Sequence, residues 1–366
     1  MLKRATGLVP WVLAAPLFLL TGCSSIGPKI LHGDRYHYNN VMNQSNNQEL
    51  LLNMVRLRYD ESTMILKVGN ISGSTSLQST ASLLATRYFG PINVNGTALV
   101  TGNAGGTYTD NPIISYTPLD DQRFTQAFLL PLSLANMNLL LESAWSISRV
   151  MRIGLQQVGD AYNAPSSARP TSSHVPEYQT FLDVVSILRD IQVKEALTNY
   201  YVKKDEVEEL VLVIGRHYRL SAKERAVFKK AGIEVHNNKI NFTNRPAPHK
   251  VFVITRSMQG ILNYLSKGLM VPPEDAKQNV LSLTTYRNGK VFDWQKVLNG
   301  MMKISYSPTP PKDAYISIFY RHRWYYVSDT DSNSKQTLIL LANMAGLIQS
   351  GGSAGSSLAP ALARTV

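Results

Sequence analysis

The chain has 366 residues, of which 44% are hydrophobic and 17% are charged. These proportions are typical of a globular protein and exclude an intrinsically disordered one. The net charge is +12, but no basic run exceeds two residues, so we interpret the charge as a diffusely basic, solvated surface. A single cysteine excludes a disulfide within the chain.

The N-terminus has the pattern of a secretory signal peptide. Lys3 and Arg4 precede an apolar run from Leu8 to Leu20, which is too short to cross a bilayer. The only cysteine, Cys23, follows this run almost directly. The segment Leu20-Thr21-Gly22-Cys23 resembles the lipobox of bacterial lipoproteins. A buried structural cysteine would not explain this position.

The lipobox resemblance implies lipidation at Cys23 and cleavage of residues 1–22. In such proteins the thiol receives a diacylglyceryl group, the chain is cut before the cysteine, and the new amino terminus is usually acylated. Two or three acyl chains anchor a protein stably. Ser24, where an aspartate would retain the protein in the inner membrane, implies transfer to the outer membrane. We therefore expect a lipid anchor in the outer membrane.

Partners follow from this expected location and from the charge. Loss of Lys3 and Arg4 with residues 1–22 leaves 344 residues with a net charge of +10. Membrane lipid is bound through Cys23, and lipid headgroups, lipopolysaccharide phosphates, peptidoglycan or an acidic protein match the basic surface. We expect a protein partner or self-association in the envelope, and no nucleic acid.

Residues 23–46 are polar and show no sustained period, so they predict a lipidated tether. A helix is expected next, with Asn47 as its N-cap. Apolar residues follow at a spacing of three to four, which is typical of an amphipathic helix: Leu50, Leu51, Met54, Val55 and Leu57.

From Thr63 to Thr117 the chain is rich in Gly, Ser, Thr and Asn, and its period changes to two. From Val94 to Tyr108, alternate residues are apolar or small, and those between them are polar apart from Leu99 and Gly105. Residues 76–86 repeat this pattern more weakly, and Tyr88–Pro91 is a plausible turn. The pattern predicts a long Gly/Ser/Thr-rich β-hairpin.

Apolar helices are predicted after this hairpin, from Thr117-Pro118-Leu119-Asp120 to Val158. We expect two or three helices, with interruptions at Pro131 and near Ser143. The most linker-like segment of the chain follows. The predicted domains are thus residues 47–160 and 177–349, separated by a linker at 161–176 and followed by a disordered tail at 350–366.

Short strands and helices alternate in the second domain, and we assign the chain to the α+β class. Ser221 and Glu224 have the spacing of a capping box. Residues 303–307 and 314–328 are expected to form a hairpin around 308–312. The other expected elements are helices at 178–192, 221–232, 257–267 and 335–349 and strands at 208–215 and 250–255.

No constellation of residues indicates catalysis, a metal or a cofactor. Gly351–Gly355 matches G-x-S-x-G but lacks a preceding strand and a downstream histidine. Asp329–Asn333 resembles the start of a calcium loop, but Ser334 and Leu340 stand where glycine and glutamate are required. We interpret this segment as a strand-to-helix turn. The seven histidines include no pair at positions i and i+4.

The aromatic segment at 314–328 contains a candidate interaction surface: Arg321, Arg323, Trp324 and Tyr325. Arginine and aromatic side chains dominate protein recognition surfaces. An edge or surface strand with stacked side chains is the alternative interpretation.

The predicted hairpin is long enough to enter a membrane. An outer-membrane strand needs about 9–11 residues of alternating polarity. Two strands cannot close a barrel, but a ring of identical subunits, each contributing one hairpin, would do so. The alternative is a soluble sheet with one face packed on the apolar helices of 119–158.

Three further segments are similar to uncharacterised lipoproteins of Gram-negative bacteria: LLNMVRLRYDES, ISYTPLDDQRF and WYYVSDTDSNSKQTL. This resemblance implies no activity or functional residue. We expect an outer-membrane lipoprotein that faces the periplasm and is a non-catalytic component of a multiprotein envelope assembly. The alternatives are an oligomeric pore built from the hairpins and a cell-wall-acting enzyme.

Overall fold

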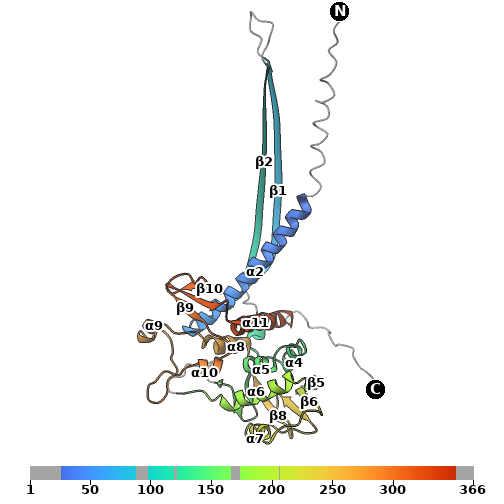
Figure 1. Cartoon of the computed structure of the whole chain (residues 1–366), viewed down its shortest axis with the longest axis vertical. Helices are drawn as coiled ribbons and strands as arrows, with labels where there is room; N and C mark the ends of the chain where they lie inside the picture. The colour runs from blue at the N-terminus through green and yellow to red at the C-terminus, as the bar shows by residue number, and fades with distance from the viewer. Residues whose placement is uncertain (1–25, 88–97, 119–121, 166–173, 206, 352–366) are drawn as a thin grey trace, which may run out of the picture. The chain divides into compact units, whose positions relative to one another are not determined.

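The protein is described by a computed structural model that covers residues 26–87, 98–118, 122–165, 174–205 and 207–351 (Figure 1). The signal peptide, Cys23, the predicted turn at 88–91 and the tail from 352 onward lie outside the described residues. The chain divides into two compact units, Met64–Asp121 and the remainder, and each is described by itself. The larger unit is called the body below. Both helices and strands are abundant, which confirms the predicted α+β class.

A six-stranded sheet organises the body, in the order β4-β3-β8-β7-β6-β5. Adjacent strands are antiparallel, except that β7 and β8 are parallel. Because β3 pairs with β8, residues on both sides of the predicted linker at 161–176 share this sheet, and the structure does not divide the chain there. The strands are β3 (Leu155–Val158), β4 (Ala161–Tyr162), β5 (Leu197–Lys204), β6 (Val207–Ile214), β7 (Lys239–Thr243) and β8 (Val251–Thr255).

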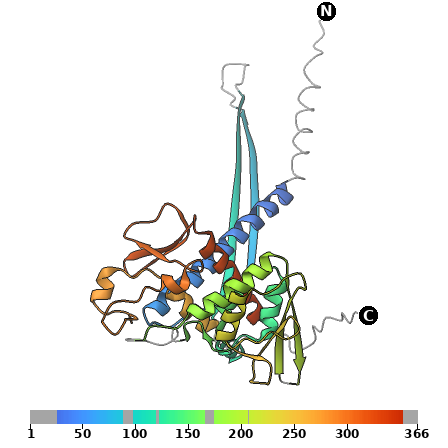
Figure 2. The ribbon, with the colours of Figure 1, turned by 60° about the horizontal axis from the view of Figure 1, so that its bottom comes forward.

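Three helices contact this sheet, α4 (Leu134–Glu142), α5 (Ile147–Gly154) and α6 (Gln179–Val193), and α7 (Ala222–Lys230) packs against α6. Apolar residues of α4 and α5 meet Leu210, Leu212 and Val253 of the sheet. Helix α6 contacts β4 and β5, and Figure 2 shows it in green near the olive strands of the sheet. The core of the body therefore lies between the helices and the sheet.

The predicted interruptions of the apolar helices are confirmed. Helix α3 (Gln122–Leu129) ends before Pro131, and α4 ends at Glu142 with Ser143 as its C-cap. The Ser133 hydroxyl accepts a hydrogen bond from the Asn136 amide and so caps the start of α4.

Helix α2 spans Ile26–Arg58 and is much longer than expected. Residues predicted as an irregular tether belong to it, and Asn47 lies inside it rather than at its N-cap. Leu51 and Met54 are fully buried and fix the C-terminal part of the helix. Adding residues to an existing helix is far easier than nucleating one, and residues 34–49 contain neither glycine nor proline. The helix therefore extends well beyond its packed part.

The C-terminal strands form a separate three-stranded sheet, in the order β10-β11-β9. These strands are β9 (Ser305–Ser307), β10 (Ala314–Tyr320) and β11 (Arg323–Ser328). The prediction of one strand over 314–328 is wrong, because Arg321 and His322 have φ angles of 47° and 61° and form a two-residue turn. Strand β9 pairs with β11, and not with β10. Such turns usually contain asparagine or glycine, and an Arg-His turn gives no such signal.

The remaining helices of the body are α8 (Met258–Ser266), α9 (Pro273–Lys277), α10 (Gln295–Leu298) and α11 (Ser332–Gly351). Helix α8 is capped by Ser257 and packs against α2 and α5. Within the described part of the chain, none of the helices is both long enough and apolar enough to cross a membrane.

The second unit consists of β1 (Leu66–Arg87) and β2 (Ala98–Pro118), which pair antiparallel. The register runs from Leu66 opposite Pro118 to Arg87 opposite Ala98, with one shift between Val68 and Ile71. The described side chains of β1 and β2 are exposed: Gln78, Thr80, Ser82, Thr101, Asn103, Thr107 and Thr109.

Candidate functional site

A buried chain of hydroxyl groups lies beneath the aromatic strand β11. The Tyr59 hydroxyl, at the C-terminal end of α2, lies 2.5 Å from Asp275 Oδ2 and 2.5 Å from the Tyr325 hydroxyl. A tyrosine has one hydroxyl proton, so Tyr59 donates to Asp275 and Tyr325 donates to Tyr59. These bonds connect α2, α9 and β11.

Two arginines extend this arrangement to the surface. Arg323 forms ion pairs with Glu274, at 3.3 Å, and with Asp275, at 3.6 Å. Arg321 pairs with Glu61 at 3.1 Å, and its guanidinium lies 4.7 Å from the centre of the Tyr59 ring. We call the whole set the tyrosine–carboxylate cluster: Tyr59, Glu61, Glu274, Asp275, Tyr320, Arg321, Arg323 and Tyr325.

The electrostatics of the cluster indicate a structural role. Burial raises the pKa of Tyr59, and the hydrogen bonds to Asp275 and from Tyr325 raise it further. Burial also raises the pKa of Tyr325. Both hydroxyls therefore stay protonated at neutral pH and act as hydrogen-bond donors rather than as general bases. The cluster holds the C-terminal sheet against α2.

The four residues predicted as an interaction surface do not form one surface, because neighbouring side chains of β11 point to opposite faces of the sheet. Tyr325 is fully buried, so it is not part of a surface, and Arg321 and Arg323 are engaged in ion pairs. Trp324 lies on the opposite face of β11, because side chains alternate along a strand. There it is paired across the strands with Phe319, which is 58% exposed, at 5.4 Å between ring centres. Sequence inspection did not identify Phe319.

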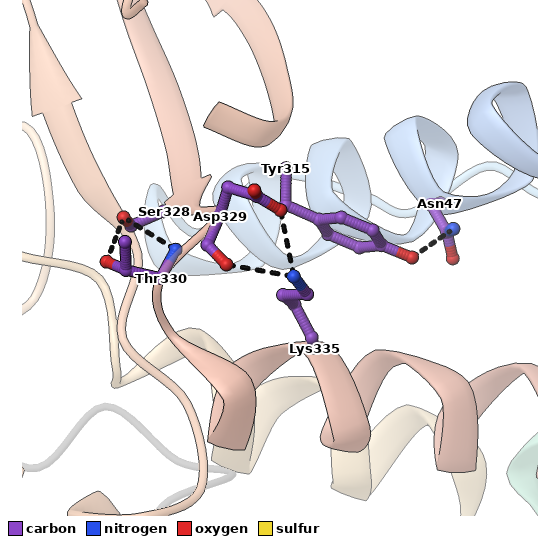
Figure 3. A network of polar contacts seen from close by, with 6 residues as sticks. All are labelled: Asn47, Tyr315, Ser328, Asp329, Thr330 and Lys335. Atoms are coloured by element: carbon purple, nitrogen blue, oxygen red, sulfur yellow. Dashed lines mark hydrogen bonds and ion pairs between the residues drawn. The ribbon is translucent and has the colours of Figure 1, made fainter. Parts of the chain in front are cut away.

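The acidic segment before α11 has the expected role of a strand-to-helix turn. Asp331 accepts hydrogen bonds from the amide and the hydroxyl of Ser334, which satisfies the start of the helix. The Lys335 ammonium lies 2.8 Å from Asp329 Oδ1 and 5.2 Å from the centre of the Tyr315 ring (Figure 3). This ammonium occupies the position beside Asp329 that a cation would take, which opposes the calcium interpretation.

An open cleft of about 800 Å³ lies beside α7. The capping box positions this helix as predicted, with Ser221 and Glu224 bonded to each other's backbone amides. Exposed cations line the cleft: Arg216, Arg219, Arg225 and Lys229. Tyr218 adds aromatic surface, and the buried Phe228 lies in the cleft wall. The cleft therefore suits an anionic group flanked by apolar surface.

The cations of the cleft are spread over fourteen positions from 216 to 229 and are separated by other residues, so no basic run marks them. Helix formation and the turn before it bring them together. Sequence reasoning described this charge as diffuse and missed the cleft.

No family model, curated protein or solved structure matches this chain.

Two histidines that are thirteen residues apart in the sequence lie beside Glu234, which lines this cleft. His236 Nε2 lies 2.9 Å from Glu234 Oε2, and His249 Nδ1 lies 3.5 Å from the same oxygen. The two imidazole rings are edge to face, 5.2 Å apart. The sequence predicts no metal ligand here, because its histidines include no pair at positions i and i+4. His236 and His249 meet because they precede two neighbouring strands, β7 and β8.

Proposed function

We propose that this protein is an outer-membrane-anchored lipoprotein that faces the periplasm and is a non-catalytic component of a multiprotein envelope assembly. The lipobox-like segment Leu20–Cys23 and the serine at position 24 support the location. The anchor is the acylated Cys23, and the body and the β1–β2 unit supply the surfaces for assembly.

One observation carries the assembly role: within the described residues, β1 and β2 pair only with each other. Each of these long strands therefore has a backbone edge without a β-sheet partner. An isolated two-stranded hairpin is marginally stable in water, and unpaired strand edges bind further strands. A second copy of the chain, or a strand of another envelope protein, would complete the sheet.

The second candidate function is a pore made of hairpins from several subunits. The register supports it at three pairs in which residues of like polarity stand opposite each other, although Leu84 is opposite Thr101 and Thr86 is opposite Leu99. Ala81 is opposite Ala104 and Ala85 is opposite Val100, whereas Gln78 is opposite Thr107. The strands have 22 and 21 residues, more than the roughly 9–11 that span a bilayer.

Membrane fractionation tests the location. We expect Cys23→Ala to remain uncut at this site and to leave the outer-membrane fraction, because the thiol is the acylation point. Ser24→Asp keeps the thiol and should move the protein to the inner membrane. Ser25→Ala serves as a control and should fractionate as the wild type. An unchanged fractionation of Cys23→Ala would refute the lipoprotein assignment.

Substitutions at two neighbouring residues distinguish the pore hypothesis from the soluble-sheet hypothesis. In a pore, Val100→Arg faces hydrocarbon and costs about 2–4 kcal/mol per subunit near the bilayer midplane. Thr101→Arg then faces the lumen and changes ion selectivity. In a soluble sheet, Val100→Arg lowers the melting temperature through burial of an unpaired charge, and Thr101→Arg has little effect. Absence of wild-type conductance in planar bilayers would reject the pore.

A further inference from the structure

We propose that Glu234, His236 and His249 form a binding site for a divalent transition-metal ion, for which zinc is the best match. This site lies in the body and is independent of the proposed lipid anchor and of the hairpin. The three side chains are exposed, so an ion reaches them directly from solvent.

The distances suit a single ion. Each residue offers one ligand atom, and these atoms all lie within 4.8 Å of one another. Zinc binds imidazole nitrogen and carboxylate oxygen at about 2.0–2.2 Å, which places ligand atoms of a tetrahedral site roughly 3.3–3.5 Å apart. The two distances to Glu234 Oε2, 2.9 and 3.5 Å, bracket this value. Small side-chain rotations are enough to surround an ion.

The backbone holds two of the ligands in place. His236 and Lys239 exchange two backbone hydrogen bonds, of 3.0 and 2.8 Å, around Asn237 and Asn238. Both asparagines have positive φ angles, 50° and 59°, as a tight two-residue turn requires. Glu234 lies two residues before His236. The first two ligands therefore come from one short, well-defined loop.

The topology of the sheet brings the third ligand to this loop. His249 has a φ angle of 56° and lies in the turn that leads into β8, where the Lys250 amide donates to the Ala247 carbonyl. Because β7 and β8 are neighbouring parallel strands, the loops that precede them meet at the same edge of the sheet. The meeting of His236 and His249 is therefore built into the fold.

The donor set indicates the class of metal. Two imidazoles and one carboxylate suit zinc, copper, nickel and iron, whereas calcium and magnesium prefer oxygen ligands alone. Three protein ligands leave a fourth position for water or another ligand. Glu234 also lines the basic cleft, so an anion in that cleft is a candidate for the fourth position.

Metal titration of the full chain tests this site. The protein is purified in detergent without a polyhistidine tag, stripped with EDTA and titrated with zinc chloride by calorimetry. We expect one zinc ion per chain, with affinity reduced at least about tenfold in His236→Ala and in His249→Ala, since each removes a ligand. Glu234→Gln should also weaken binding. His174→Ala removes an exposed histidine elsewhere and should bind as the wild type.

A spectroscopic and a thermal measurement complete the test. Cobalt(II) in place of zinc should give visible absorption bands of a four-coordinate ion with the wild type, and these bands should be lost in both histidine variants. Zinc should raise the melting temperature of the wild type and of His174→Ala only. Melting in EDTA shows that each variant is folded. The site is refuted if the wild type shows no saturable binding, or if both histidine variants bind as tightly as the wild type.

Discussion

The hydroxyl groups of Tyr59 and Tyr325 lie 2.5 Å apart although the two residues are 266 positions apart in the chain. Tyr59 directly follows the last residue of α2, and Tyr325 lies in the central strand of the C-terminal sheet. Asp275 accepts a hydrogen bond from the Tyr59 hydroxyl and adds α9 to the contact. This contact fastens the C-terminal sheet to α2.

Removal of the Tyr59 hydroxyl should destabilise the body. Tyr59→Phe deprives the buried Asp275 carboxylate of a donor, and we expect a loss of about 1.5–3 kcal/mol in the free energy of unfolding. Tyr325→Phe removes a bond between two neutral hydroxyls and should cost about 1 kcal/mol. Urea unfolding measures both values. Tyr326→Phe, on the other face of β11, is the control, and equal stability of Tyr59→Phe and wild type would contradict this role.

Arg256 is fully buried, and its replacement should destabilise the body. Its guanidinium donates to the carbonyls of Leu155 and Asn163 and lies 4.1 Å from the centre of the Tyr264 ring. Burial lowers its pKa to about 10, so it remains charged at neutral pH. Arg256→Lys keeps the charge but loses the planar fork that reaches both carbonyls.

We expect Arg256→Lys to lower the free energy of unfolding by about 2–4 kcal/mol, because buried carbonyls are left without donors. The control is Arg216→Lys at the exposed rim of the cleft, which should change stability by less than about 0.5 kcal/mol. Chemical denaturation of the two variants side by side provides the comparison. Similar losses of unfolding free energy in both variants would show that the hydrogen bonds from the Arg256 guanidinium to the two carbonyls do not contribute to stability.

Lys267 should make stability depend on pH. Burial, together with the nearby Arg58, lowers the pKa of Lys267 to about 8, from 10.5 in an exposed lysine. Between these pH values the unfolded chain binds more protons than the folded one, so the free energy of unfolding rises with pH. The neutral variant Lys267→Met should flatten this rise and gain at most roughly 3 kcal/mol at neutral pH.

Urea unfolding at several pH values from about 7 to 9.5 measures the Lys267 effect. Above this range the tyrosines of the unfolded chain ionise. Because Tyr59 and Tyr325 have raised pKa values in the folded protein, they then lower the free energy of unfolding as the pH rises. A wild-type free energy that is flat or falling across the measured range would contradict the assignment to Lys267.

Alanine substitutions at two glycines with positive φ angles distinguish the cost of backbone strain from the cost of a steric clash. A Cβ atom on Gly159 (φ 53°) would lie 2.3 Å from the Ala231 carbonyl oxygen, whereas one on Gly289 (φ 78°) would have no neighbour within 4 Å. Gly289→Ala should therefore cost only the strain of about 1–2 kcal/mol. Gly159→Ala should cost clearly more. Equal melting temperatures for the two variants would show that the loop around Ala231 yields to the new methyl group.

Local sequence signals predicted many elements of the body correctly. The capping box at Ser221 and Glu224 depends on neighbouring residues, and the structure has it, as it has the helix expected at 257–267. The Arg-His turn between β10 and β11 was missed because its residues lack the usual turn signature. The length of α2 was missed because its N-terminal part carries no apolar stripe.

The candidate sites depended on long-range contacts that a single sequence does not show. Tyr325 was expected on a surface, but the pleat of β11 turns it toward Tyr59. His236 and His249 are thirteen residues apart and meet only because β7 and β8 are parallel neighbours. Alternation along one strand can be read from sequence, whereas the choice of buried face and of strand partner depends on the whole fold.

The native mass of the detergent-extracted wild-type protein, measured by light scattering with correction for bound detergent, tests the assembly proposal most directly. We expect a mass well above that of a single chain, either a multiple of the chain mass or the mass of a complex with another protein. Crosslinking before extraction should capture the same species. A preparation that contains only single chains, both with and without crosslinker, would contradict the proposed role.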